Sequence, residues 1–149
     1  MIQYHIAQVN IARAKAEMDD DVMTGFVSRL DEINSLADNS PGFIWRLQDE
    51  EGDATSIRVF DDSFLLVNMS AWKDIESLRN FVYKSIHVEL IGNREAWFNK
   101  MDLAHQALWW IPNGTIPTVE DAKEKLDHIR INGSTATAFT FGRPFDPPK

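Results

Sequence analysis

Cysteine is absent from this chain of 149 residues. Disulfide bonds, thiolate metal sites and cysteine nucleophiles are therefore excluded. Clusters of basic residues are missing as well, and the formal net charge is −8. This balance argues against a surface for the phosphates of nucleic acid or for an anionic membrane. We expect neither nucleic acid nor a membrane as a partner.

Long apolar runs are also missing. The first fifteen residues, MIQYHIAQVNIARAK, lack the uncharged apolar core of a signal peptide. No run approaches the length of a transmembrane helix, so a soluble cytoplasmic protein is the default expectation. The sequence also has no glycine-rich phosphate loop, nucleophile elbow or paired-carboxylate motif. It therefore identifies neither a reaction nor a ligand by motif.

The sequence does contain regular hydrophobic patterns. With 44% hydrophobic and 26% charged residues, the composition is that of a globular chain, and residues 1–149 are predicted to form a single domain. Alternation with a period of two predicts strands, at residues 4–11, 43–48, 55–60, 64–72, 105–111 and in the tail at 139–145. Helical spacing predicts helices, at residues 22–37, from 74 through two segments to 98, and from Thr118 to Asn132.

This order of elements predicts an α+β fold. It contains the two βαβ halves of a ferredoxin-like sandwich, in which an antiparallel sheet carries helices on one face. The strand at 64–72 shows two different faces. Leu65, Val67, Met69 and Ala71 suit packing under helices. Asn68, Ser70 and Trp72 form the opposite, partly polar face, which we expect to be free of helices.

A helix-free face with large apolar side chains would be exposed in a monomer. A homodimer that packs two such faces together would cover them and enclose a cavity. Asn68 and Ser70 favour a cavity over a dry interface, because buried polar groups need partners. Trp72 suits either a cavity wall or a dimer core.

Tyr4, Gln8 and Asn10 would line the same face of the first strand. Asn10 suits orientation of a ligand carbonyl or hydroxyl, or a hydrogen bond to its own loop. Arg46 is the cation of a core strand. It suits a bidentate clamp on a carboxylate, or an ion pair with a partner chain or with the acidic turn at 49–53.

His87 follows a predicted helix break at Ser85. A general base and a locally hydrogen-bonded helix residue are both consistent with this position. A metal site would need His5, His87 and His105 to converge, and no spacing of the His-x-x-x-His kind supports that. We therefore predict no metal site.

Six stretches together resemble a family of uncharacterised proteins in the dimeric α/β-barrel superfamily. They are YHIAQVNIARAKA at 4–16, SPGFIWRLQ at 40–48, NMSAWKDIESLRNFVY at 68–83, REAWF at 94–98, LWWIPNGTIPTVEDAKEKL at 108–126 and FTFGRPF at 139–145. The superfamily also contains monooxygenases related to antibiotic biosynthesis, which here is an analogy of fold. Some of its members act on haem or polyphenols with an Asn, a Trp and a His. Asn10, Trp72 and His87 are the loose counterparts, although the spacing from Trp72 to His87 differs from that of haem-degrading members.

The resemblance implies a dimeric α/β barrel and suggests three hypotheses. The first is a cofactor-independent, monooxygenase-like enzyme acting on a small apolar or aromatic molecule. Trp72 and Tyr4 would hold the ligand, Asn68 and Asn10 would bond it, and His87 would move a proton. The second is a non-catalytic binding module with the same cavity, with haem as one candidate ligand. The third is a dimer whose polar face is merely an interface.

Overall fold

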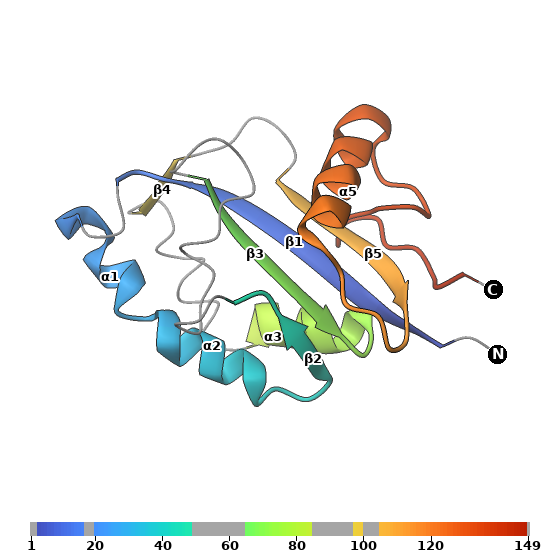
Figure 1. The fold of residues 1–149 in the computed structure, drawn as a ribbon, viewed down its shortest axis with the longest axis horizontal. Coiled ribbons are helices and arrows are strands. Elements are labelled where there is room, and N and C mark those ends of the chain that lie inside the picture. The colour runs from blue at the N-terminus through green and yellow to red at the C-terminus, as the bar shows by residue number, and fades with distance from the viewer. Residues whose placement is uncertain (1–2, 17–19, 49–64, 85–96, 100–104, 149) are drawn as a thin grey trace.

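The computed structural model describes residues 3–16, 20–48, 65–84, 97–99 and 105–148. Within these residues the strands form one sheet in which every pairing is antiparallel. They are β1 (Tyr4–Ala14), β2 (Phe43–Arg46), β3 (Leu65–Trp72), β4 (Phe98–Asn99) and β5 (Gln106–Pro112). The strand β1 is central: β3 pairs with one of its edges, while β4 and β5 share the other edge (Figure 1).

The described helical elements are η1 (Asp21–Met23), α1 (Thr24–Val27), α2 (Leu30–Asp38), α3 (Ile75–Lys84) and α5 (Val119–Asn132). The order β2-β3-β1-β5, with helices after β1 and after β3, is that of a ferredoxin-like sheet. The predicted α+β class is confirmed. The helix α5 is an addition after the last strand of this arrangement.

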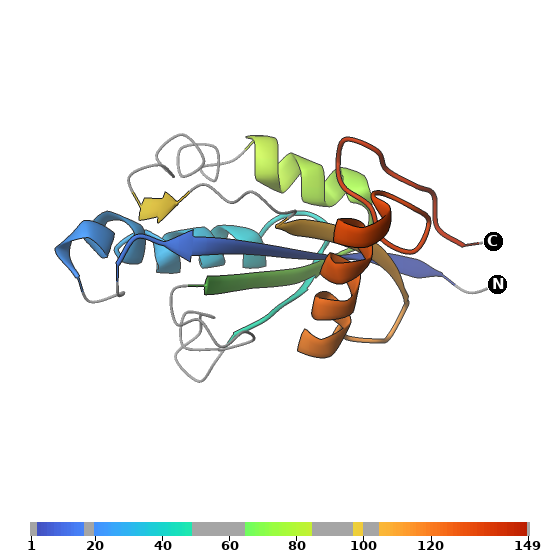
Figure 2. The same ribbon diagram turned by 90° about the horizontal axis from the view of Figure 1, so that it is seen from above.

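The prediction that helices occupy one face of the sheet is wrong. One cluster joins α5 to the sheet face that carries Ala7, Met69 and Trp109, through Ala122, Leu126 and Ile129. The alanines Ala7, Ala71 and Ala107 present small side chains on this face, which allows a helix to approach closely. Figure 2 shows α3 and α5 on opposite sides of the sheet.

The opposite face carries Trp72, and it was expected to be free of helices. Instead, Trp72 clusters with Ala37 of α2, Leu78 of α3 and Phe139 of the C-terminal segment. These apolar side chains cover the face where β3 ends. Elements of the same chain therefore cover this part of the face on which the predicted homodimer was based.

A third cluster covers the other end of the same strands. It joins Ala14 and Leu66 of the sheet to Met23 and Trp97. Gly25 lies against the Trp97 ring, where an added Cβ would stand 3.1 Å from the indole carbon Cζ2. The predicted continuous helix over 22–37 is broken at Ser28, and Phe98, expected within a helix, pairs with Ala14 in β4.

Most other predicted elements are present. The expected capping box opens α5, because Thr118 accepts from the Asp121 N–H and Asp121 accepts from the Thr118 N–H. In the tail, Phe139 bridges to Leu108 without a longer strand. The predicted strand at 55–60 and the second helical segment up to residue 96 lie outside the described residues. No helix of the described part of the chain has the length and apolarity to cross a membrane.

Candidate functional site

Polar side chains cross the sheet between the two clusters that contain Trp72 and Trp97. Strand register places Asn10 opposite Asn68 on one side and Gln106 on the other, and places Gln8 opposite Ser70. All five side chains point to the face that α2 and α3 partly cover. We call Gln8, Asn10, Asn68, Ser70 and Gln106 the amide belt.

Within the amide belt, Gln8 connects the two strands. Its side-chain Nε2 donates to Asn68 Oδ1 at 2.7 Å and to Ser70 Oγ at 2.8 Å. Gln8 and Ser70 are each 6% exposed, whereas Asn68 is exposed. The belt is therefore buried on one side and open at Asn68, as a site that admits a small molecule requires.

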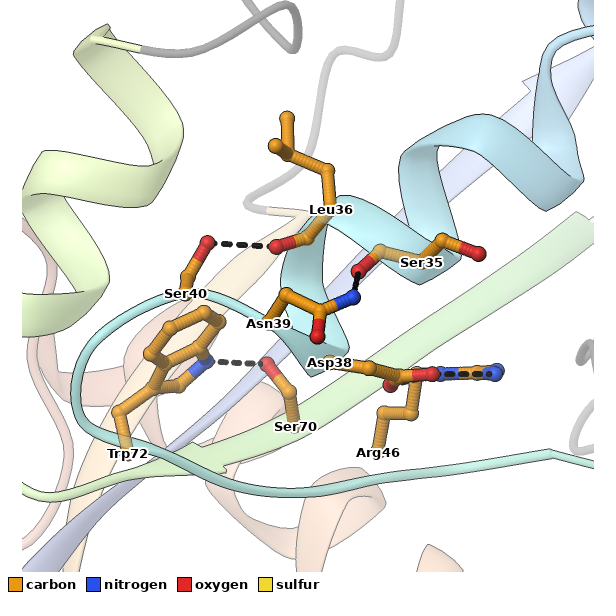
Figure 3. Close-up of polar contacts among 8 residues, drawn as sticks. All are labelled: Ser35, Leu36, Asp38, Asn39, Ser40, Arg46, Ser70 and Trp72. Atoms are coloured by element: carbon orange, nitrogen blue, oxygen red, sulfur yellow. Dashed lines mark hydrogen bonds and ion pairs between the residues drawn. The ribbon is translucent and has the colours of Figure 1, made fainter.

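Trp72 belongs to this network through its indole N–H, which donates to Ser70 Oγ at 2.8 Å (Figure 3). Its ring is fully buried. Phe81 stacks on it with a centroid separation of 5.1 Å, and Phe43 meets it edge-on at 5.3 Å. In this position Trp72 contributes to the core and orients Ser70, and it presents no open ring face to a ligand.

Arg46 also pairs with Ser70 in the strand register. Its guanidinium Nε donates to Asp38 Oδ1 at 2.8 Å, at the end of α2 (Figure 3). The sequence suggested an ion pair for Arg46 with a partner chain or with the turn at 49–53, and that turn lies outside the described residues. Among the described residues Asp38 is a partner of Arg46. This pair fixes α2 against β2 beside the amide belt.

Tyr4 lies apart from the belt. It is half-buried at the start of β1, opposite Pro112. Asn10 is six residue steps further along the extended strand, a distance of roughly 20 Å, and the fully buried Ile6 lies between them. Tyr4 and Asn10 therefore do not converge on one small ligand.

The histidines do not gather in the described part of the chain. His87 lies outside the described residues. His5 is half-buried on the α5 side of β1, and His105 is exposed. His128 lies within hydrogen-bonding distance of Thr135, with Nε2 2.6 Å from Oγ1. Among the described residues no cluster of three or more His, Asp or Glu side chains could hold a metal ion.

Two belt residues carry roles that the sequence did not indicate. Gln8 was placed on the correct face but given no role, and Gln106 was not singled out. The alternation of HQALWWI with a period of two indicates which face Gln106 occupies. Its neighbour in space depends on strand register, which alternation does not supply.

A separate groove lies between α3 and the C-terminal segment. It has a volume of about 580 Å³ and is lined by residues that include Arg79, Tyr83, Phe145 and Asp146. Arg79 and Tyr83 both contact the ring of Phe141, at 5.7 Å and 5.8 Å. None of the residues that line this groove belongs to the amide belt.

Comparison with solved structures finds proteins with a similar fold. A mutant of SnoaB, a cofactor-independent oxygenase from Streptomyces nogalater, has a TM-score of 0.50 and 15% identity, over 76% of this chain and 98% of that one. The protein PA3566 from Pseudomonas aeruginosa has a TM-score of 0.50 and 11% identity, over 77% and 99%. NE2512 from Nitrosomonas europaea, a protein of unknown function, gives 0.49 and 11%, over 78% and 95%. At these identities the likeness concerns the fold alone.

No curated protein matches the sequence. A family model does match, and it covers residues 5–149, nearly the whole chain. The model is described as a domain of unknown function (DUF3291). Apart from Tyr4 at the start of β1, the sheet, its helices and the amide belt lie within the matched residues. This chain is therefore a member of the DUF3291 family.

Proposed function

We propose that this chain binds a small apolar or aromatic molecule at the amide belt and acts on it as a cofactor-independent oxygenase. The observation that carries the proposal is a buried polar network that reaches the surface at Asn68. Gln8 and Ser70 are 6% exposed and bonded to one another, and the exposed Asn68 completes the network. Burying polar side chains is costly unless their hydrogen bonds are satisfied, so a buried polar network calls for a physical explanation, and a bound ligand is the one that we propose.

The surroundings of the belt suit an apolar ligand body. Ala12 follows Asn10 on the same face of β1 and is half-buried. Beyond it lies an aromatic group in which Phe26 contacts Trp97 at 5.9 Å and Phe98 at 5.0 Å. A ligand bonded at Asn68 could extend toward these rings over about 7–14 Å, which is two to four residues of strand.

Oxygenation without a cofactor requires few functional groups from the protein. The substrate supplies the electrons: a CH₂ group becomes a carbonyl, and dioxygen supplies one oxygen atom to the product and one to water. The protein would orient the substrate and remove a proton. Asn68, Asn10 and Ser70 would orient it, and His87 would accept the proton. The solved oxygenase from Streptomyces nogalater supports this proposal by analogy of fold.

A non-catalytic binding module is the second candidate. It is favoured by the composition of the belt, because Gln8, Asn10, Asn68, Ser70 and Gln106 contain no group that titrates near neutral pH. Catalysis would therefore depend on His87. Haem is one ligand to test for this module.

Oxygen uptake distinguishes these candidates. Purified protein freed of metals with a chelator would be mixed with phenols, naphthols and anthrones in ¹⁸O₂, and products read by mass spectrometry. We expect uptake above the protein-free rate and one ¹⁸O atom in the product. His87→Ala should abolish turnover while leaving binding intact, and Asn68→Ala should weaken both. Asn80→Ala, an exposed asparagine on α3, is the matched control.

A binding module would give the opposite pattern. Ligands would bind, but no substrate would consume oxygen faster than in buffer, and His87→Ala would change nothing. Adding haemin and recording the Soret band tests the haem alternative. A shifted band that Asn68→Ala abolishes would favour haem binding over oxygenation.

A further inference from the structure

Among the described residues, the hydrogen bonds of the amide belt leave specific atoms without partners. Trp72 and Gln8 both donate to Ser70 Oγ, which fills its two lone pairs and leaves its own proton to donate. Gln8 Nε2 uses both protons, on Ser70 and Asn68, and leaves Oε1 as an acceptor. No described residue bonds Gln8 Oε1, the Ser70 proton or Asn68 Nδ2.

From these atoms we infer that the belt selects a neutral ligand carrying a hydrogen-bond donor next to an acceptor, such as a carboxamide or a hydroxy-ketone, and rejects carboxylates. The donor would meet Gln8 Oε1. The acceptor would meet the Ser70 hydroxyl and Asn68 Nδ2. This inference rests on the proposed function, because it concerns the ligand of the same site.

The selection does not depend on which way the two amides are turned. If both are reversed, Gln8 Oε1 accepts from Ser70 and from Asn68 Nδ2. Gln8 Nε2 is then the unpaired donor and Asn68 Oδ1 the unpaired acceptor. In both arrangements Gln8, Asn68 and Ser70 together offer one amide oxygen and at least one N–H or O–H, so the ligand that complements these three residues has one donor and one acceptor.

The charges around the belt give a second reason to expect that it rejects carboxylates. All five belt side chains are neutral. The cation nearest in strand register, Arg46, is bonded to Asp38. A carboxylate entering the belt would lose hydration, face an amide oxygen and gain no cationic partner there among the described residues. Burying an unpaired charge is far more costly than burying a hydrogen-bonded neutral group.

Matched aromatic fragments test the inference directly. The probes are benzamide, with a donor and an acceptor, and benzoate, with two acceptors and a charge. Each is titrated into ¹⁵N-labelled protein at neutral pH. The NMR signals to follow are the Trp72 indole N–H, which reports on Ser70, and the side-chain amides of Gln8 and Asn68. We expect benzamide to shift them with at least about tenfold higher affinity than benzoate, because the mismatch leaves buried polar groups unpaired.

One substitution should reverse the preference. Gln8→Glu keeps the shape of the side chain, and Ser70 and Asn68 can turn to donate to the new carboxylate. The belt then loses Gln8 Nε2 as a donor and gains a negative charge. We expect benzamide to weaken and the cation benzamidine to bind instead. Gln48→Glu makes the same change at an exposed position outside the belt and should leave all three affinities unchanged.

The outcomes separate this inference from the proposed function. Benzoate binding at the belt as tightly as benzamide would overturn the selectivity while leaving a binding site. If neither fragment moved the belt signals, the site itself would be refuted, and the proposed function with it. A benzamide preference without oxygen uptake by any substrate would uphold this inference and remove the oxygenase. Comparing benzamide with benzoate on the wild-type protein tests the selectivity even if Gln8→Glu does not fold.

Discussion

Trp72 donates its indole N–H to the hydroxyl of Ser70, two residues earlier on β3, across 2.8 Å. The ring of Trp72 is fully buried between Phe43 and Phe81. A core side chain is thereby connected to the amide belt. The stability of the core and the hydrogen-bonding state of the belt are coupled through this one contact.

Ser70→Ala should expose that coupling. The variant leaves the Trp72 N–H and one Gln8 N–H buried without an acceptor, so the free energy of unfolding should fall by about 1–3 kcal/mol. Urea titration measures it. Ser35→Ala, an exposed position on α2, should stay within about 0.5 kcal/mol of the wild type. Equal stability of the two variants would contradict the network. Adding Trp72→Phe in a double-mutant cycle isolates the Trp72–Ser70 interaction energy.

Gly42→Ala should destabilise the protein through two effects. Gly42 has a φ of +84°, which L residues rarely adopt, and an added Cβ would overlap the Ser77 side chain at the start of α3. Gly114 has a φ of +90° but open space around it, so Gly114→Ala isolates the backbone cost of about 1 kcal/mol. Thermal and urea unfolding should show a clearly larger loss for Gly42→Ala. Similar losses would mean that Ser77 moves aside freely.

Asp74 makes stability depend on pH. It caps α3 and accepts from the Ser77 N–H at 2.8 Å. This bond and a second one from the Ser77 hydroxyl hold the pKa of Asp74 below its ordinary value of 3.8. Because the folded-state pKa is the lower one, the stabilisation is present above the unfolded-state pKa and is lost as pH falls through the folded-state pKa.

Asp74→Asn should remove this dependence while keeping the cap. Asparagine caps helices about as well as aspartate but does not titrate. Urea unfolding between pH 2.5 and 6 should show a smaller loss of stability on acidification than in the wild type. Asp74→Ala should lose about 1 kcal/mol at neutral pH. Identical acid profiles for the wild type and Asp74→Asn would show that another group controls this range.

Leu126→Ala tests the position of α5. Leu126 is 1% exposed against the sheet face that carries Met69, and truncation of such a leucine costs roughly 2–5 kcal/mol. Ile131, on the same helix but 80% exposed, provides the control Ile131→Ala, which should change stability little. Both should be measured at several protein concentrations. A cost for Leu126→Ala that appears only at high concentration would indicate that a partner chain covers this face.

Patterns that are local in the sequence predicted the elements well. Alternation predicted β1, β3 and β5, and the Thr118–Asp121 pair predicted the start of α5. Local sequence patterns predicted element boundaries less well where contacts between distant residues determine the structure. Met23 and Phe26 fit a continuous helix, but contact of this segment with Trp97 accompanies a break at Ser28.

The site was predicted less completely because its assembly is non-local. Alternation correctly grouped Asn68, Ser70 and Trp72 on one face of β3. It could not indicate that helices cover both faces: Val67, Met69 and Ala71 pack against α5 as expected, but the face of Trp72 is not free of helices. The pairing of Arg46 with Asp38 depends on how α2 returns to β2. A homodimer stays a prediction, and the sheet face on which it was based is covered in a single chain by α2, α3 and the C-terminal segment.

The amide belt also has a consequence for how the strands find their alignment. Sliding β3 by two residues along β1 would keep apolar side chains on one face and polar ones on the other, so hydrophobic patterning alone cannot reject it. Such a slip would place Gln8 opposite Trp72 or Asn68 instead of Ser70. With Trp72 opposite, the buried amide of Gln8 would face an indole ring that offers no acceptor. The same residues that we propose to select a ligand therefore also discriminate the native alignment from its nearest competitors during folding.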